Sequence, residues 1–124
     1  MVVFTLRLLA TADTRAEIVQ SLRALIGPTQ AERGCVGCRL QQDADDPNLL
    51  TFVEEWAQQP DLDRHMASDD YHRLLLVMDM ASAPPDVTLM TVMNESPLDR
   101  IAAVRETRLS GQQEPLPPPP QTTN

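Results

Sequence analysis

Alternation of apolar and polar side chains predicts a β-strand over residues 2–9. Phe4, Leu6 and Leu8 lie on one face of this segment, and the opposite face, which includes Val3 and Arg7, is only partly polar. A period of two residues places successive side chains on opposite faces of a strand. The chain is therefore expected to open with a strand that buries at least its Phe4 face.

A helix is expected to follow this strand. Thr14 and Glu17 have the spacing of a capping box, in which two side chains satisfy free backbone N–H groups at a helix N-terminus. Apolar residues then recur at helical intervals, and they are Ile18, Val19, Leu22, Leu25 and Ile26. Gly27 and Pro28 are expected to interrupt the helix, with one last turn after them, and Gly34 to lie in the exit turn.

Two further strands are predicted over residues 35–42 and 49–56. The six residues between them, 43–48, are rich in turn formers and indicate a β-hairpin. The second of these strands is apolar on both faces for most of its length. A strand of this kind requires cover on both sides.

A pair of helices is predicted next. Pro60 opens a short helix in which Leu62, His65 and Met66 share a face, and Ser68 caps a second helix. The inward stripe of the second helix consists of Tyr71, Leu74, Leu75 and Met78. Residues 86–93 then predict a fourth strand that is apolar on both faces, and a final short helix begins near residue 97.

The predicted order is β-α-β-β-α-β, which defines an α+β class with a ferredoxin-like, antiparallel four-stranded sheet. Helices can cover only one face of this sheet, and the other face carries Val53, Met90 and Val92. Packing this face against a second copy would remove it from water, so a homodimer is predicted. The domains expected are a ferredoxin-fold domain over residues 1–95, a helical extension over 96–110 and a proline-rich flexible tail over 111–124.

Composition restricts the partners. The formal net charge is -8, from 18 acidic and 10 basic residues, and such a surface repels nucleic acid and anionic membranes. No apolar stretch has the length of a membrane span, and the N-terminus lacks the layout of a signal peptide, so a cytoplasmic protein is expected. The sequence has no glycine-rich phosphate loop, and neither a nucleotide cofactor nor a metal is expected.

Cys35 and Cys38 form a C-x-x-C pair that invites a redox or metal interpretation. Residues three apart in a regular strand point to opposite faces, so the two thiols are not expected to converge. We therefore interpret both as small buried side chains.

Three segments together are similar to one known family. They are residues 33–40, the turn at 45–48 that leads into Phe52-Val53-Glu54-Glu55-Trp56, and residues 61–68 followed by Tyr71. Over about residues 1–93 the chain resembles the antibiotic biosynthesis monooxygenase domain family, the ABM family, whose members are dimeric α/β barrels. The resemblance implies a cofactor-independent monooxygenase that acts on a small aromatic or quinol-type compound. The haem-degrading branch is disfavoured, because residues 2–9 lack its asparagine and Leu75 occupies the expected haem-ligand position.

His65 is the candidate catalytic residue. A cofactor-free oxygenase needs a base for its substrate, and a histidine on an inward helix face has a suitable ordinary pKa of about 6.5. The alternative is a buried structural histidine, hydrogen-bonded to a strand backbone or to Glu54.

The candidate substrate-binding residues surround His65, in a pocket expected between the sheet and the helices. They are Trp56, Tyr71, Glu54, Phe52 and Met66. Each also has a structural interpretation: the aromatic rings can close the core, and Glu54 can pair with His65 or Arg39. Two other functions remain open, a non-catalytic homodimer that binds a small hydrophobic molecule or serves in stress, and an accessory protein recruited through its proline-rich tail.

Overall fold

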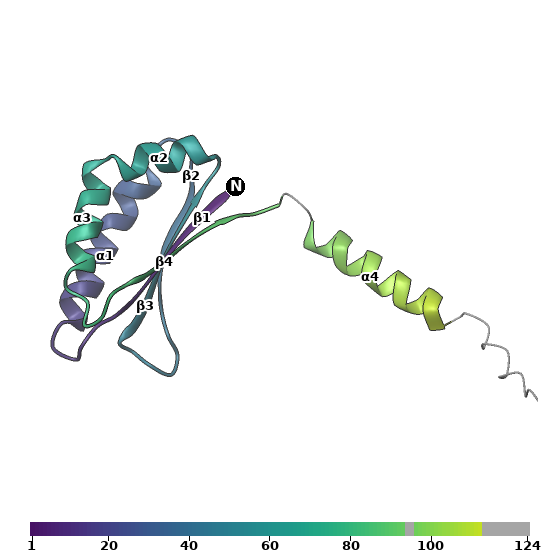
Figure 1. Ribbon diagram of the computed structural model, residues 1–124, viewed down its shortest axis with the longest axis horizontal. Helices are drawn as coiled ribbons and strands as arrows, with labels where there is room; N and C mark the ends of the chain where they lie inside the picture. Colours follow the sequence, from purple (N-terminus) through teal and green to yellow (C-terminus); the bar gives the residue numbers. More distant parts are fainter. Residues whose placement is uncertain (94–95, 113–124) are drawn as a thin grey trace, which may run out of the picture. The chain divides into compact units, whose positions relative to one another are not determined.

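The seven elements of the first 93 residues confirm the predicted order, with two helices in the second helical position. The computed structural model describes residues 1–93 and 96–112 and divides into two units, Met1–Met93 and Asn94–Asn124. The elements of the first unit are β1 (Val2–Leu9), α1 (Arg15–Gln30), β2 (Cys35–Gln42), β3 (Leu49–Trp56), α2 (Gln59–Met66), α3 (Asp69–Met78) and β4 (Asp86–Thr91). Within these residues α1, α2 and α3 lie on one side of the sheet (Figure 1).

The sheet has the strand order β2-β3-β1-β4, and every neighbouring pair is antiparallel. This is the ferredoxin-like arrangement that the sequence predicts. Phe4 lies opposite Glu54, and Leu6 lies opposite Phe52. Because directly opposed residues of an antiparallel pair point to the same face, these four side chains all face the helices.

The hydrophobic core lies between this face of the sheet and the helices. The even-numbered residues of β1 and β3 are buried in it, together with the apolar stripes of the three helices. The largest fully buried apolar side chains are Trp56, Phe4, Phe52, Leu6, Ile18, Leu22, Leu50, Leu62 and Leu74. Burial of these side chains supplies most of the driving force for folding.

The helix layer leaves β4 uncovered. Val87 lies opposite Leu6 and Leu89 opposite Phe4, so both point to the helix side of the sheet. They are nevertheless 41% and 52% exposed, whereas Leu6 and Phe4 are 0% and 1% exposed. Since β4 is also an edge strand, its helix side forms an open apolar strip beside the covered core.

The start of α1 differs from the prediction. Thr14 has helical backbone angles and makes no capping hydrogen bond through its side chain. Instead its Oγ1 accepts from the backbone N–H of Thr11. A capping residue needs an extended backbone, so the capping-box prediction is wrong. Ser68 does have an extended backbone, and its side chain accepts from the N–H of Tyr71 as predicted.

The end of α1 also differs, because the helix runs without interruption through Gly27 and Pro28 to Gln30. Proline removes a single backbone donor, and it stands only two residues before the helix ends, so little of the hydrogen-bond ladder is lost. The exit turn is as predicted: Gly34 has a φ of 85°, which favours glycine.

A β-bulge changes the placement of the two cysteines. Cys35 lies opposite Trp56 and Cys38 opposite Glu54, and the register shifts by one residue between Cys35 and Gly37. Both cysteines therefore point to the helix face, and the prediction of opposite faces is wrong, because a bulge adds a residue to the alternation. Cys38 is buried, Cys35 is partly buried, and both are free thiols.

The second unit contains the predicted final helix, α4 (Pro97–Gln112), whose Leu98, Ile101, Val104 and Leu109 side chains are exposed. The proline-rich segment at 115–120 lies outside the described residues. Among the described residues, none of the helices combines the length and hydropathy needed to cross a membrane.

Candidate functional site

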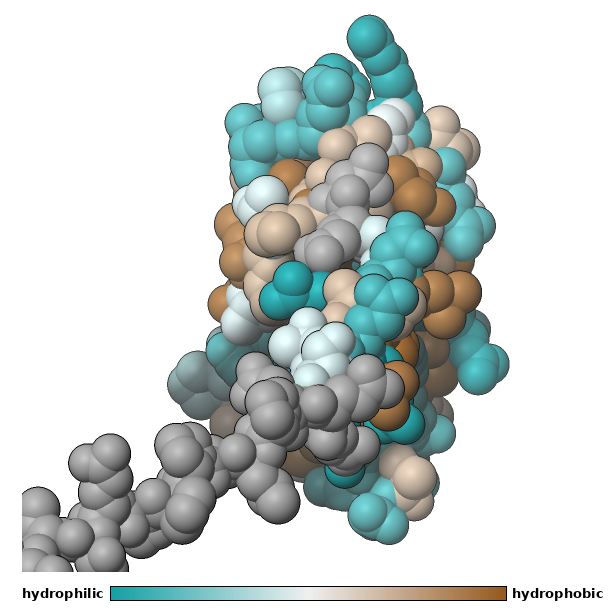
Figure 2. All heavy atoms as spheres, turned by 90° about the vertical axis from the view of Figure 1, so that its right-hand side faces the viewer, coloured by the Kyte–Doolittle hydropathy of each residue, from teal (hydrophilic) through white to brown (hydrophobic). Residues whose placement is uncertain are grey.

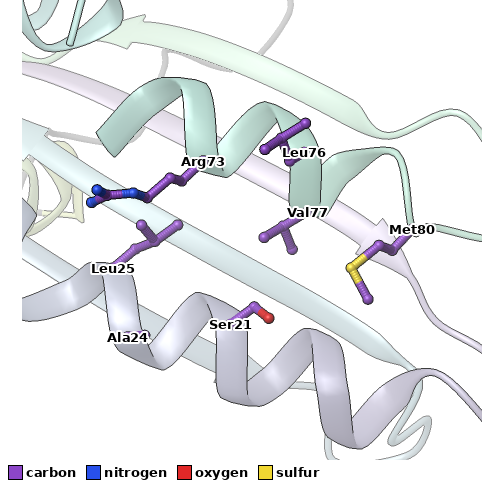
Figure 3. Close-up of a pocket in the computed structure, with 7 residues that line it drawn as sticks. All are labelled: Ser21, Ala24, Leu25, Arg73, Leu76, Val77 and Met80. Atoms are coloured by element: carbon purple, nitrogen blue, oxygen red, sulfur yellow. The ribbon is translucent and has the colours of Figure 1, made fainter. Parts of the chain in front are cut away.

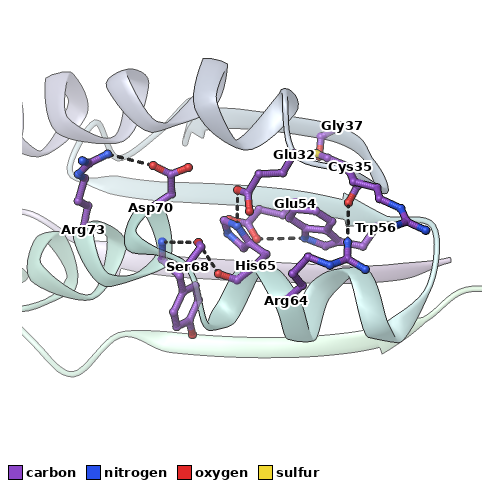
Figure 4. A network of polar contacts seen from close by, with 12 residues as sticks. Glu32, Cys35, Gly37, Glu54, Trp56, Arg64, His65, Ser68, Asp70 and Arg73 are labelled. Carbon is purple, nitrogen blue, oxygen red and sulfur yellow. Dashed lines mark hydrogen bonds and ion pairs between the residues drawn. The ribbon is translucent and has the colours of Figure 1, made fainter.

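Side chains from β3 and from the turn before β2 meet around His65 of α2. Its Nε2 lies 3.0 Å from Oε2 of Glu54, and its Nδ1 lies 2.6 Å from Oε2 of Glu32. The indole Nε1–H of Trp56 donates to the other oxygen of Glu54, over 3.2 Å. Figure 4 shows these contacts in a row from Glu32 to Trp56. We call Glu32, Glu54 and His65 the carboxylate–histidine cluster.

Local structure explains why these groups converge. Glu54 and Trp56 are two residues apart in β3, so both face the helices, and Trp56 is fully buried. His65 shares the inward face of α2 with Leu62, and both are buried. Each residue thus occupies a core position of its own element, and three polar groups meet inside an apolar core.

Glu32 reaches the cluster from the turn between α1 and β2. Its N–H donates to the carbonyl of Thr29, and its own carbonyl accepts from the N–H of Cys35. The carbonyl of Gly34 also accepts from the N–H of Ala57, which ties the turn to the end of β3. The backbone of Glu32 is therefore fixed on both sides, although it lies outside the regular elements.

The two carboxylates set the protonation of His65. Burial disfavours the charged imidazolium, but the hydrogen bond to Glu54 and the negative charges of Glu54 and Glu32 outweigh burial, so the pKa of His65 is raised. Protonated histidine donates from both ring nitrogens, which matches a carboxylate oxygen on each side. The cluster therefore holds a proton more tightly than an isolated histidine does.

Aromatic rings enclose the histidine. The Trp56 ring lies 4.7 Å from the His65 ring, tilted by 30°, and the Tyr71 ring meets His65 edge-on at 5.7 Å. Phe4 also contacts Tyr71, with ring centroids 6.0 Å apart. Burial and the charge of Glu54 raise the pKa of Tyr71, so its hydroxyl stays protonated at neutral pH.

The remaining sequence candidates lie in the same core. Phe52 is 1% exposed on the helix face of β3, and Met66 is partly buried against the core. Arg39 pairs with Glu55 at 2.7 Å, so of the two partners proposed for Glu54 the structure selects His65. The sequence prediction missed Glu32, which lies in the turn between α1 and β2 and carries no periodic signal that would point it inward.

A groove lies elsewhere, between α1 and α3 (Figure 3). It has a volume of about 410 Å³. The residues that line it are Ser21, Ala24, Leu25, Arg73, Leu76, Val77 and Met80. These do not include the predicted substrate-binding residues, so this groove is separate from the carboxylate–histidine cluster.

The order of the elements and the antiparallel strand order β2-β3-β1-β4 place the first unit in the class of ferredoxin-like α+β domains. Residues 1–75 match the family model described as antibiotic biosynthesis monooxygenase. The chain belongs to this ABM family.

Named relatives agree with this assignment. The chain is 31% identical over 91 residues to a Mycobacterium tuberculosis protein named "Putative monooxygenase Rv0793", covering 73% of this chain and 89% of that protein. The solved structure of Rv0793 has a TM-score of 0.70 and 29% identity, covering 77% of this chain and 97% of Rv0793. A Deinococcus radiodurans structure, 20% identical with a TM-score of 0.72, covers 77% of this chain and 96% of its own and supports the fold alone.

Proposed function

We propose that this protein is a cofactor-independent monooxygenase that acts on a small aromatic or quinol-type compound. The observation that carries the proposal is the carboxylate–histidine cluster, in an ABM-family domain. Its titratable histidine is buried beside the rings of Trp56 and Tyr71. Titratable groups with shifted pKa values concentrate at catalytic sites. His65 in its neutral form is the proposed proton acceptor, through Nε2, with Glu54 as its partner.

The proposed chemistry starts with loss of the substrate's hydroxyl proton, which makes the ring electron-rich enough to react with dioxygen. In the conversion of a phenol to a quinone, one oxygen atom of O₂ enters the ring. The other leaves as water with the two hydrogens that the substrate loses, and four electrons pass from substrate to O₂. The site must therefore take up a proton and release it again when water forms.

The substrate is proposed to lie along the uncovered helix side of β4, next to Tyr71. Val87 and Leu89 offer apolar surface there, and Phe4, their neighbour on β1, contacts the Tyr71 ring. A planar apolar compound suits such a surface, and Tyr71 and Trp56 are the proposed walls around the reacting ring. Phe52 and Met66 shape the site from within the core.

Oxygen uptake by the purified protein with a panel of quinols and phenols tests this function. We expect uptake with at least one compound, and its loss in His65→Ala. Because that change leaves Glu54 buried without its partner, His65→Gln is tested as well: glutamine can hydrogen-bond both carboxylates but does not titrate. His72→Ala is the control, since His72, the other histidine, is exposed. Full activity in a folded His65→Gln variant would refute His65 as the base.

One observation favours the alternative, a non-catalytic domain that binds a small hydrophobic molecule. Among the described residues, every buried side-chain nitrogen and oxygen has a hydrogen-bond partner. A fully satisfied network can serve the structure of the core alone. Binding of a panel compound without oxygen uptake, unchanged in His65→Gln, would favour this alternative.

We also propose that the protein forms a homodimer through the sheet face opposite the helices. Met90 and Val92 are 55% and 38% exposed, although Val53 is already buried within the chain at 5%. In Figure 2, hydrophobic and hydrophilic residues are interspersed among the coloured atoms that face the viewer.

Sedimentation velocity of Met90→Glu tests the dimer, because the substitution buries an unpaired charge in the proposed interface from each copy. Leu76→Glu is the matched control, since Leu76 is 54% exposed but lies on α3. Loss of the dimer in Met90→Glu alone is expected. A monomeric native protein, or equal behaviour of the two variants, would refute this interface.

A further inference from the structure

Glu32 is the member of the carboxylate–histidine cluster that meets solvent. The side chains of His65 and Glu54 are each 1% exposed, whereas that of Glu32 is 24% exposed. Glu32 is also the closer partner of the imidazole, at 2.6 Å against 3.0 Å for Glu54. The cluster therefore has an inner carboxylate, a buried ring and an outer carboxylate in line.

A proton taken up by buried groups needs a route to water, because nothing else in a closed core can receive it. We propose that Glu32 is a positioning residue that orients His65 and passes protons between its Nδ1 and water. This inference rests on the proposed function, since it concerns the proton that the substrate releases.

The transfer is balanced in protons and moves no electrons. When Nε2 of neutral His65, beside Glu54, takes the substrate proton, a new Nε2–H bond forms. The Nδ1–H bond then breaks and its proton passes to Oε2 of Glu32. Glu32 then releases that proton to water, and the steps reverse when the second product, water, forms. The imidazole needs no rotation, because each nitrogen already faces one carboxylate (Figure 4).

The other groups around His65 are less suited to this role. Glu54 is buried, and the Trp56 N–H is a donor that already points at Glu54. The Tyr71 ring lies nearly perpendicular to that of His65, and burial and Glu54 raise the pKa of the Tyr71 hydroxyl, so Tyr71 exchanges protons poorly at neutral pH. Arg64, the neighbour of His65 in sequence, contacts Asp61 and the Arg33 carbonyl instead.

Glu32→Gln tests the proposal, with Glu55→Gln as the matched control. Glu55 has nearly the same side-chain exposure, 23%, and also one close cationic partner, but that partner is Arg39. We expect Glu32→Gln to lower kcat about tenfold or more with little change in KM, and to move the acid limb of the pH profile to lower pH. Acetate, a small soluble carboxylate, is expected to restore activity to Glu32→Ala in a concentration-dependent way.

A second readout does not require activity. Trp56 is the single tryptophan and lies against His65, and an imidazolium quenches an adjacent indole, so tryptophan fluorescence reports the titration of His65. In Glu32→Gln this titration should shift to lower pH, whereas in Glu55→Gln it should match the native protein.

The two proposals fail in different ways. A fluorescence titration unchanged in Glu32→Gln overturns the role of Glu32, even if the native protein consumes oxygen. A shifted titration in a protein that oxidises none of the compounds supports the coupling of Glu32 to His65 and refutes the oxygenase. Retained kcat in Glu32→Gln, or no rescue by acetate, overturns the relay.

Discussion

Replacing Glu54 by glutamine removes one charge from the centre of the core and changes almost nothing else. Glutamine has the same shape, its carbonyl can still accept from the Trp56 N–H, and its amide can donate to Nε2 of neutral His65. The variant therefore isolates the interaction between the Glu54 carboxylate and the imidazolium. Its effect on stability should depend on pH.

The direction of this pH dependence follows from the raised pKa of His65. A histidine with a raised pKa in the folded state adds stability that is fully present below its unfolded pKa of about 6.5 and is lost as pH rises through the folded value. Glu54→Gln reduces this shift, so it should cost most stability under mildly acidic conditions. The loss should shrink as the solution becomes alkaline.

The size of the stability loss in Glu54→Gln follows from replacing a hydrogen bond to a charged group by a neutral one. A bond to a charged group contributes about 1.5–3 kcal/mol and a neutral one about 0.5–1.5 kcal/mol, so Glu54→Gln should cost about 1–2 kcal/mol near pH 5.5. For a domain of this size that is a fall of about 5–10 °C in Tm. Glu54→Leu, which leaves the Trp56 N–H and His65 without this partner, should cost about 3–5 kcal/mol.

Urea unfolding of the native protein and of the Glu54→Gln variant, at several pH values between about 5.5 and 9, measures the loss in the free energy of unfolding. Glu55→Gln again serves as the control, because Glu55 pairs with Arg39 on the opposite face of the sheet. A loss in Glu54→Gln that is the same at both ends of the pH range would refute the reasoning, since it would mean that His65 carries no charge shared with Glu54.

Gly34→Ala should lower the free energy of unfolding, measured in urea, by about 2 kcal/mol or more. The reason is that Gly34 has a positive φ and a new Cβ would overlap the side chain of Asp61. Gly27→Ala, in a helix with open space around it, should instead gain about 0.5–1 kcal/mol, and equal effects would contradict this account. Burial raises the pKa of Cys38 to about 12, so a thiol reagent near pH 8 should label Cys38 only on unfolding. Peptide mass mapping checks this, and labelling of native Cys38 at the rate of the unfolded chain would contradict it.

Regular elements were predictable from sequence because their residues repeat with fixed periods. The ranges of β1, β2 and β3 match the predicted segments, while β4 ends at Thr91 rather than at residue 93. The errors occur where a single residue departs from the period. The bulge between Cys35 and Gly37 reverses the side of the strand on which Cys35 lies. The helical backbone of Thr14 prevents its side chain from capping α1, although the sequence has the spacing of a capping box.

The site was predictable only in part for the same reason. His65 and Glu54 lie on faces that periodicity assigns to the core, so their contact could be anticipated as one of several pairings. Glu32 lies in a turn, where periodicity says nothing about direction. Its place beside His65 depends on the path of the turn through Gly34 and on pairing across 33 residues of sequence.

The exposed side chains of β4 contribute little to folding stability, so they can change with little loss of stability in this small domain. Val87 and Leu89 keep a large part of their surface exposed, so replacing them removes few core contacts and should cost little folding free energy. Substitutions in the packed layer around Phe4 and Leu6 would be far more damaging. Side chains along β4 can therefore change while the carboxylate–histidine cluster stays intact. Under the proposed function, we expect substitutions at Val87 and Leu89 to alter which compounds bind and to leave the stability of the fold nearly unchanged.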